Sequence, residues 1–383
     1  MPKERALIIS ESTVYTDAHG DFVSRGGGET CIHNLAVSLL ELGIEVEVFG
    51  IQEYIDQRDE EIIGGVLYKR FPIHSRSSLK IFSYLRTALE KCREFDTIFL
   101  NQFTPHLILP FIKARKVAVI HDVYVGNGVS FWMTNYGFFR GLAGALIERA
   151  QLFFDRVYSD VIFTVSESSR KKILRFIGPS SEKKIVVDPF PIDAGEYISD
   201  RTKEDFLLFV GRFVDYKHPS HVLYVLRRVM EVYPNFKAVF VVPRAENAFM
   251  DDFYRLVHQY KIGENLEVKN FVSVEELRGL YARAKVLVQP SYIEGQGIVV
   301  LESLASGTPV VAYDLDAYEG MLIDGENSML AEVGNMEALA DGCLRILGEY
   351  EAFRNRCGVT LGGFSAESFR EVLRGAIVSW RCF

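Results

Sequence analysis

The chain has 383 residues, of which 48% are hydrophobic and 25% charged, and its formal net charge is −8. This length exceeds one ordinary hydrophobic core and suits two domains, and the composition excludes the disordered and fibrous classes. The acidic balance argues against a nucleic-acid partner, because nucleic-acid-binding domains are usually strongly basic.

The five cysteines are scattered along the chain and form no CxxC pair. We therefore expect neither a disulfide framework nor a structural zinc site. Free cysteines of this kind indicate a reducing, cytoplasmic compartment. The apolar stretch over residues 6–9 is too short for the core of a signal peptide. Because no run of about 18 apolar residues occurs, we expect no membrane span.

Short β-branched runs alternate with helical patterns along the first half of the chain. We expect strands over residues 6–10, 44–50, 97–101, 117–121, 161–165 and 185–187. We expect helices over residues 29–42, 79–92, 138–154 and 167–177. Continuous apolar strands separated by helices are typical of a parallel sheet covered on both faces.

The pattern breaks after residue 187, where two prolines and a glycine precede a charged stretch, and then restarts. We expect strands over residues 206–211, 238–242, 266–268, 286–289 and 309–312, and helices over 220–232, 249–258, 274–283, 298–306, 336–347 and 367–380. The predicted fold is α/β, with two Rossmann-like, doubly wound domains. Ligands of such sheets bind beyond the carboxyl ends of the strands, so we expect the two domains to face a cleft.

A glycine run that includes Gly27 and Gly28 opens the first helix. Glycines let a backbone approach a ligand closely, and free N–H groups at a helix start attract anions. The run is interpreted either as an anion-binding loop or as a plain flexible turn. It does not match the spacing of a dinucleotide fingerprint.

Two cations, Arg212 and Lys217, follow the strand that ends at Gly211. At the carboxyl end of a strand they are placed to neutralise a diphosphate leaving group, and otherwise they are two solvated loop charges.

Residues 290–310 form a glycine-rich turn followed by an apolar helix, with Glu294 before the helix and Glu302 within it. A retaining glycosidase holds its two carboxyl groups about 5 Å apart, whereas eight residues of helix rise about 12 Å. We therefore expect these carboxylates to hold different hydroxyl groups of one long ligand. An unpaired Glu302 on an apolar helix would be costly, so we expect it to have a partner.

His121 and Asp122 end a strand of the first domain, and His106 follows the preceding strand. Each histidine is either a structural group or part of a ligand site. The aromatic segment 131–139, together with a basic stretch over 170–175, is interpreted either as core packing beside a solvated helix face or as a lipid groove or peripheral membrane contact.

These motifs resemble family 4 glycosyltransferases, which have the GT-B fold. Residues 290–297, Pro-Ser-Tyr-Ile-Glu-Gly-Gln-Gly, and the later Glu302 with Gly307, Pro309 and its valines are similar to the family's E-x7-E signature. Gly211-Arg212 with Lys217 is similar to its G-R-x(4)-K loop, and the glycine run to its N-terminal glycine loop. The resemblance extends over nearly the whole chain.

The resemblance implies a role for each motif. Gly28, with Gly27 beside it, would donate a backbone N–H to the diphosphate, and Arg212 and Lys217 would hold its charge. Glu294 would contact the donor sugar, and His121 would lie beside the transferred sugar and the acceptor. The remaining donor-binding positions would be Gly295, Gln296, Gly297, Ile298 and, for the ribose hydroxyls, Glu302.

The resemblance also implies domain roles. Residues 1–195 would form the acceptor-binding domain, 196–363 the nucleotide-sugar-binding domain, and 364–383 a helix that crosses back to the first. Two positions depart from the family pattern: Gln296 replaces a phenylalanine, and residues 190–193 lack the family's asparagine. The sequence therefore leaves the effect of Gln296 on donor choice open.

The predicted function is that of a retaining glycosyltransferase that moves a hexose from a UDP-, GDP- or ADP-sugar to a glycan, lipid-linked or small-molecule acceptor, with no metal or other cofactor. A same-face reaction, in which the leaving phosphate accepts the acceptor's proton, fits the lack of a second close carboxylate. The alternatives are a sugar-nucleotide epimerase of the same fold and a non-catalytic sugar-nucleotide binder. The protein would be cytoplasmic, and peripheral association with a membrane stays open.

Overall fold

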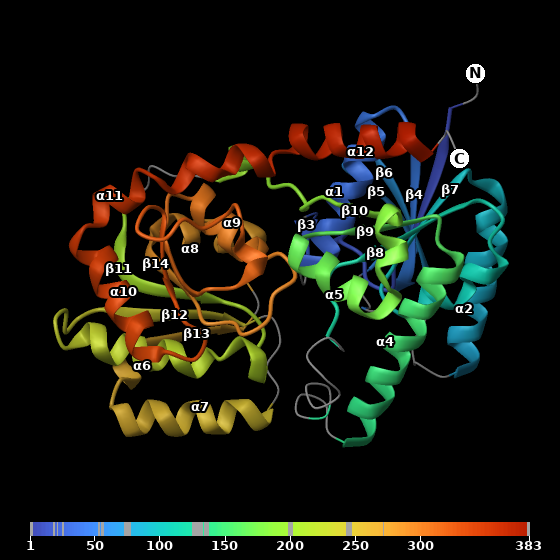
Figure 1. Ribbon diagram of the computed structural model, residues 1–383. Helices are drawn as coiled ribbons and strands as arrows, with labels where there is room; N and C mark the ends of the chain where they lie inside the picture. Colours follow the sequence, from blue (N-terminus) through green and yellow to red (C-terminus); the bar gives the residue numbers. More distant parts are fainter. Residues whose placement is uncertain are drawn as a thin grey trace. The chain divides into compact units, whose positions relative to one another are not determined.

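The computed structural model (Figure 1) describes residues 3–17, 20, 22–24, 27–52, 54, 57–72, 78–124, 133, 138–197, 202–242, 247–270 and 272–380. The chain divides into two compact units, Met1–Pro191 with Ala366–Phe383, and Ile192–Ser365. The sequence predicts these changes of unit at 195/196 and 363/364. Each unit has its own sheet and its own core.

The N-terminal unit contains an eight-stranded sheet of order β10-β9-β8-β7-β1-β4-β6-β5. Its neighbours pair in parallel, except that β5 runs antiparallel to β6. The strands are β1 (Arg5–Ile9), β4 (Glu45–Gln52), β5 (Glu60–Ile63), β6 (Val66–Pro72), β7 (Thr97–Asn101), β8 (Arg115–Ile120), β9 (Val161–Thr164) and β10 (Ile185–Val187), and a separate hairpin joins β2 (Tyr15–Thr16) to β3 (Phe22–Val23).

Helices cover both faces of this sheet. Alternate residues along a strand point to opposite faces, so neighbouring residues pack against different helices. Leu7 and Leu100 pack on the side of α2 (Ser78–Lys91) and the 3₁₀ segment η2 (Thr104–Phe111). Leu100 lies in register with Ala118, which packs with α4 (Phe138–Tyr158) and α5 (Glu167–Ile177). Ala6 lies on the other face with α1 (Gly27–Glu41) and α12 (Ala366–Trp380).

The C-terminal helix α12 is therefore part of the N-terminal unit. Its Phe369 is 1% exposed, and its ring lies 5.9 Å from that of Phe163 and 5.7 Å from that of Phe190. Arg370 of α12 pairs with Glu41 at the end of α1.

The C-terminal unit contains a six-stranded parallel sheet of order β13-β12-β11-β14-β15-β16. The strands are β11 (Glu204–Val210), β12 (Lys237–Val242), β13 (Leu266–Asn270), β14 (Ala284–Gln289), β15 (Val310–Tyr313) and β16 (Ser328–Ala331). The helices are α6 (Pro219–Met230), α7 (Asn247–Tyr260), α8 (Val274–Arg283), α9 (Ile298–Ala305), α10 (Met336–Gly348) and α11 (Tyr350–Arg354).

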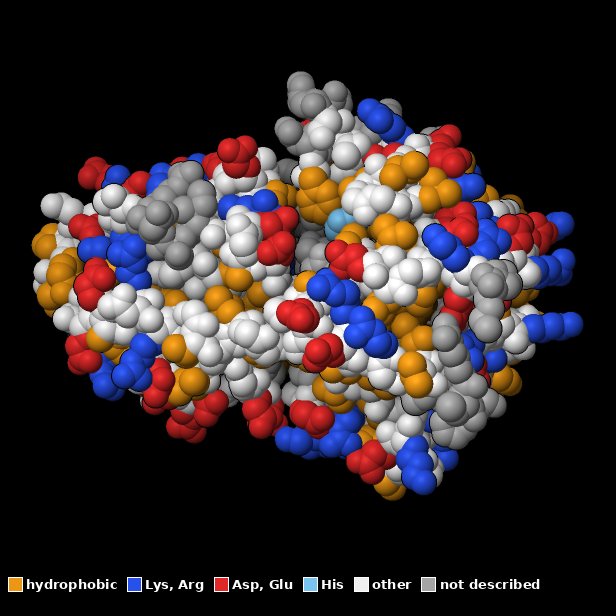
Figure 2. Space-filling view, turned by 90° about the horizontal axis from the view of Figure 1, so that it is seen from above, with side chains coloured by type: hydrophobic (Ala, Val, Ile, Leu, Met, Phe, Trp, Pro, Cys, Tyr) orange, Lys and Arg blue, Asp and Glu red, His pale blue; other side chains and the backbone are white. Residues whose placement is uncertain are grey.

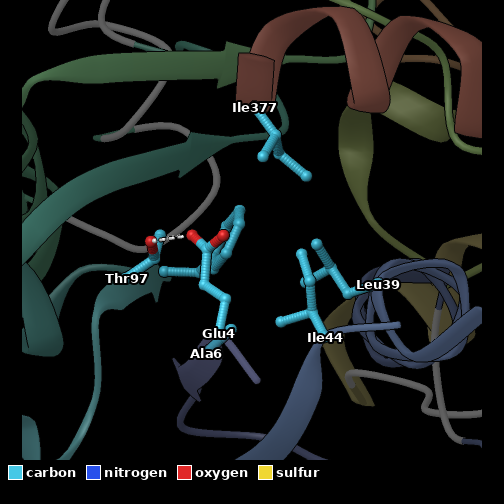
Figure 3. A pocket seen from close by; sticks show the side chains of 7 residues that line it. Glu4, Ala6, Leu39, Ile44, Thr97 and Ile377 are labelled. Atoms are coloured by element: carbon cyan, nitrogen blue, oxygen red, sulfur yellow. Dashed lines mark hydrogen bonds between the residues drawn. The ribbon is translucent and has the colours of Figure 1, made fainter. Parts of the chain in front are cut away.

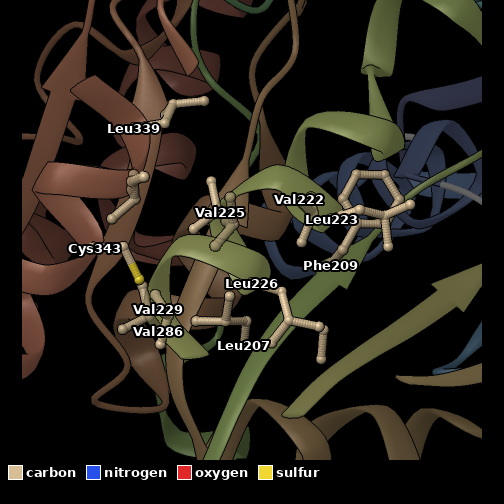
Figure 4. Packing of buried hydrophobic residues seen from close by; sticks show 14 of the residues in the cluster. Leu207, Phe209, Val222, Leu223, Val225, Leu226, Val229, Val286, Leu339 and Cys343 are labelled. Carbon is tan, nitrogen blue, oxygen red and sulfur yellow. The ribbon is translucent and has the colours of Figure 1, made fainter. Parts of the chain in front are cut away.

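Two hydrophobic clusters hold this second sheet. On one face α6, α7 and α10 pack together, and Figure 4 shows Val225 and Val229 of α6 near Cys343 of α10 and Val286 of β14. On the other face α8 and α9 pack against the sheet. The sheet is covered on both faces, so the loops at the carboxyl ends of its strands are left to bind ligands.

Candidate functional site

The two motifs of the C-terminal unit meet at the carboxyl ends of adjacent strands. The loop after β11 contains the 3₁₀ turn η6 (Asp215–Lys217), and the loop after β14 leads into α9. The backbone N–H of Tyr292 donates to the carbonyl oxygen of Tyr216 at 2.8 Å and joins the two loops.

Lys217 and Glu294, which are 77 residues apart in sequence, form a largely buried ion pair at this junction. Gln289, the last residue of β14, also donates to Glu294 Oε1 at 2.8 Å. Burial alone raises the pKa of Glu294, but the charge of Lys217 and hydrogen bonds from Lys217, Gln289 and Ser291 outweigh it and hold the pKa below its usual range. Glu294 is therefore an anion at neutral pH, held in one orientation.

Arg212 lies on the same loop, and its side chain is more exposed than that of Lys217. Its guanidinium donates to the Tyr216 hydroxyl and lies 5.9 Å from the centre of that ring. Lys217 Nζ is also 5.9 Å from the Tyr216 ring. Tyr216 thus holds both predicted phosphate-binding cations on one short turn.

The turn between Glu294 and α9 contains Gly295, Gln296 and Gly297, and Ile298 is the first helical residue. Gly297 has φ +83°, and a Cβ atom there would lie 2.6 Å from Cε1 of the buried Tyr318. Gln296 is buried. The turn precedes a helix start, where free N–H groups and the helix dipole favour an anion.

Glu302 lies on α9 and has partners different from those of Glu294. Tyr197 donates to its Oε1 at 3.1 Å and Tyr281 to its Oε2 at 2.8 Å. Burial raises the pKa of Glu302, although these hydrogen bonds and the charge of Arg278 oppose the rise. The two carboxylates are therefore held in separate environments and form no hydrogen-bonded acid–base pair.

In the N-terminal unit, His121 follows the carboxyl end of β8. Its Nε2 lies 2.8 Å from Oδ1 of Asn101, the last residue of β7, and Asn101 Nδ2 donates to Ser10 Oγ at 3.0 Å. Because Oδ1 can only accept, Nε2 carries the proton and the lone pair of the ring is on Nδ1. Burial lowers the pKa of His121 to about 4, so the ring is neutral at pH 7.

Gly27 and Gly28 are exposed residues in the first turn of α1. A Cβ atom at Gly28 would have no neighbour within 4 Å. Arg25 and Gly26, which precede this helix start, lie outside the described residues.

Two other sequence candidates have different surroundings. His106 is fully buried, and its Nδ1 lies 2.5 Å from Oδ1 of the equally buried Asp155 on α4. This pair links η2 to α4. Of the aromatic segment 131–139, only Met133, Phe138 and Phe139 lie among the described residues.

One cluster beside the ion pair was missed by sequence reasoning. The rings of His218 and His221 stack at 4.5 Å, and His218 lies 3.8 Å from the ring of Tyr292. His221 Nδ1 and the Tyr313 hydroxyl are 2.8 Å apart. The i, i+3 spacing of the histidines at the start of α6 was the one available signal.

Figure 3 shows a cavity elsewhere in the N-terminal unit, beneath α12. Its volume is about 10 Å³, and Ala6, Leu39, Ile44 and Ile377 are among the residues that line it. A space of this size holds at most one water molecule and excludes a sugar. The described part of the chain also contains no group of three His, Cys, Asp or Glu side chains placed to hold a metal ion.

The chain matches two families that together extend over both units. Residues 25–196 match Glycosyltransferase Family 4, and residues 198–359 match Glycosyl transferases group 1. An uncharacterized glycosyltransferase of Methanocaldococcus jannaschii is 26% identical over 84% of this chain and 86% of its own. The O-antigen chain mannosyltransferase RfbU of Salmonella typhimurium is 27% identical over 63% of this chain and 66% of its own.

The fold is similar to that of Anabaena HepE in complex with UDP-glucose. The TM-score is 0.78 at 13% identity, over 98% of this chain and 99% of HepE. The two-sheet architecture predicted from the sequence thus matches a solved GT-B structure. The chain belongs to the family 4, group 1 glycosyltransferases of the GT-B fold, which transfer a sugar from a nucleotide sugar with retention and without a metal cofactor.

Proposed function

We propose that the C-terminal unit binds a nucleotide diphosphate-hexose and that the N-terminal unit binds the acceptor. In this proposal Arg212, Lys217 and the N–H groups at the start of α9 bind the diphosphate. Glu294 accepts from the hexose hydroxyls, and Glu302 accepts from the ribose hydroxyls. Gly27 and Gly28 add backbone N–H groups at the start of α1.

The observation that carries this proposal is the buried Lys217–Glu294 pair with Gln289 behind it. Taking two charges out of water costs free energy that a pair of this kind often does not recover. An ion pair kept at the carboxyl ends of two central strands is therefore better explained by binding than by stability. Lys217 faces the anionic part of such a donor and Glu294 its hydroxyls.

Two relatives support a hexose as the transferred group. The Anabaena protein was crystallised with UDP-glucose, and the Salmonella relative is a mannosyltransferase.

The proposed reaction takes place on one face of the sugar. The bond from C1 to the phosphate oxygen breaks as the bond from C1 to the acceptor oxygen forms, and the acceptor's proton passes to the leaving phosphate. Arg212 and Lys217 stabilise the charge that develops on that phosphate. The Nδ1 lone pair of neutral His121 accepts a hydrogen bond from a hydroxyl of the bound substrates.

The test separates donor binding from protein stability. In the Lys217→Met/Glu294→Gln double variant the ion pair is removed without leaving either charge unpaired. We expect its free energy of unfolding to stay within about 2 kcal/mol of that of the natural chain. We expect the thermal stabilisation by UDP-, GDP- or ADP-hexoses to be lost.

The control is Lys237→Met, which removes an exposed lysine at the start of β12 and should leave the response to ligands unchanged. Stabilisation by nucleotide sugars that survives in the double variant would show that the pair has only a structural role. NMR of the product made by the natural chain checks the stereochemistry, and an inverted linkage would exclude the same-face reaction.

A further inference from the structure

The helix α4 buries three polar side chains beside the core residues Ala145 and Leu152, and it exposes a row of apolar ones. Its buried face contains Glu148, Gln151 and Asp155, which are at most 7% exposed. Glu148 accepts from the backbone N–H of Tyr124 at 2.7 Å, and Asp155 lies 2.5 Å from His106. The polar groups that a surface helix usually turns to water are here hydrogen-bonded inside the unit.

The outward face of α4 is apolar along its length. Exposed side chains follow one another at spacings of three, four and seven residues, which places them on one stripe of a helix. We call this the outer stripe: Phe139, Leu142, Leu146, Phe153 and Val157. Phe139 is 83% exposed, and Leu146 and Phe153 are 56% and 60% exposed. From its first to its last residue the stripe extends about 27 Å along the helix.

The charges beside the outer stripe have one sign. Among the described side chains of α4, both carboxylates are buried, and the exposed charged groups are Arg149 and Arg156. At 100° per residue both arginines lie along the same border of the stripe. The whole chain has a net charge of −8, so this helix opposes the charge of the molecule that carries it.

Neighbouring elements extend the apolar surface. The segment η2 contacts both α4 and α2 and exposes Leu107 and Phe111, with the exposed Lys113 after them. The first turn of α2 exposes Leu79 and Phe82. Figure 1 shows α2 and α4 extending away from the sheet on the side opposite α12. Seen from the side of α12, by contrast, acidic and basic side chains are interspersed with small apolar patches (Figure 2).

We propose that the outer stripe of α4 docks on an anionic lipid bilayer, with the helix axis in the plane of the interface. An apolar helix face bordered by arginines is the pattern of an interfacial helix, and anionic headgroups complement those arginines. Exposed apolar surface of this extent marks an interaction site. No helix of the described residues is long and apolar enough to cross the bilayer, so the contact is peripheral. This binding is independent of the sugar-transfer reaction.

The test is co-sedimentation of the full chain with phosphatidylcholine vesicles that contain either no phosphatidylglycerol or about 30 mol% of it. The natural chain should bind the anionic vesicles, and binding should weaken as salt rises from about 0.1 M to about 1 M. The Leu146→Glu/Phe153→Glu variant should bind at least about ten-fold less tightly, because charges replace the inserted side chains.

The matched control is Val359→Glu, which places the same charge at an exposed valine of the C-terminal unit and should leave vesicle binding unchanged. Circular dichroism of each variant reports whether it stays folded, and sedimentation equilibrium reports how it associates. Failure of the natural chain to bind anionic vesicles would overturn the proposal. So would a dimer that Leu146→Glu/Phe153→Glu dissociates while vesicle binding persists, since the stripe would then contact a second copy.

Discussion

Gly297 is the residue of the donor site whose identity is most tightly set by geometry. It combines a φ of +83° with a contact that leaves no space for a side chain, because a Cβ atom would lie 2.6 Å from the ring of Tyr318. Tyr318 is itself buried and is held in place by the core on which α9 packs. The start of α9, and with it the N–H groups proposed to bind phosphate, depends on a residue without a side chain.

We therefore predict that Gly297→Ala destabilises the C-terminal unit by about 2–5 kcal/mol, the sum of a left-handed backbone and an overpacked contact. Denaturant unfolding measures the loss. The control is Gly279→Ala in α8, where a Cβ atom would have no neighbour within 4 Å. The control should be neutral or slightly stabilising, since alanine favours a helix. Equal effects of the two substitutions would contradict the prediction.

The sequence identified single residues of the site better than it identified their partners. Glu294 and Lys217 were both predicted to be functional, but their pairing across 77 residues follows from β11 and β14 being neighbours in the sheet. A partner was expected for Glu302 on the grounds of burial. The partners of Glu302 are two tyrosines, Tyr197 in an irregular segment and Tyr281 in α8. Their approach depends on packing that one sequence does not reveal.

Among the elements, most strands with continuous apolar residues were predicted, including β10 and β13 at sheet edges, whereas β2, β3, β5, β6 and β16 were not. The strand β6, which lies between β4 and the edge strand β5, has Lys69 and Arg70 side by side among its apolar residues, and β16 is only four residues long. Arg70 is nevertheless buried, because Glu61 of β5 pairs with it at 2.6 Å. Charged residues that are buried in such a hairpin interrupt the apolar pattern, so the sequence does not predict these strands.

The helix α12 was predicted as a helix, and its contacts give it a stabilising role in the N-terminal unit. We predict that Phe369→Ala costs about 3–5 kcal/mol, the range for removing a buried phenylalanine. Hydrogen exchange should show the loss of protection in the sheet that contains β9 and not in the sheet that contains β11. The control Val378→Ala, at an exposed position of the same helix, should change stability by less than about 0.5 kcal/mol. Equal loss of protection in both sheets would contradict this role.

At the scale of the whole molecule, burial keeps two of the described histidines in each unit neutral. Burial lowers the pKa to about 4 for His33 and His121 in one unit and for His218 and His221 in the other. Between pH 4 and 6.5 the unfolded chain binds protons at these positions and the folded chain does not. Stability contributed by these histidines is therefore lost as the pH falls through this range. Burial raises the pKa of Asp188 to about 8, and this carboxyl acts in the opposite direction.

Substitution of one histidine should lower by one the difference in bound protons between the unfolded and the folded chain. His33→Gln should reduce the pH dependence of the free energy of unfolding by about 1.4 kcal/mol per pH unit between pH 4 and 6.5. Guanidinium unfolding at half-unit steps of pH measures the slope for the natural chain and the variant. The control is Tyr68→Phe, which removes the hydroxyl 2.7 Å from His33 Nδ1 but keeps the titrating ring. That variant should lower stability at every pH and leave the slope in place, whereas a slope unchanged in His33→Gln would show that this histidine already binds its proton in the folded state.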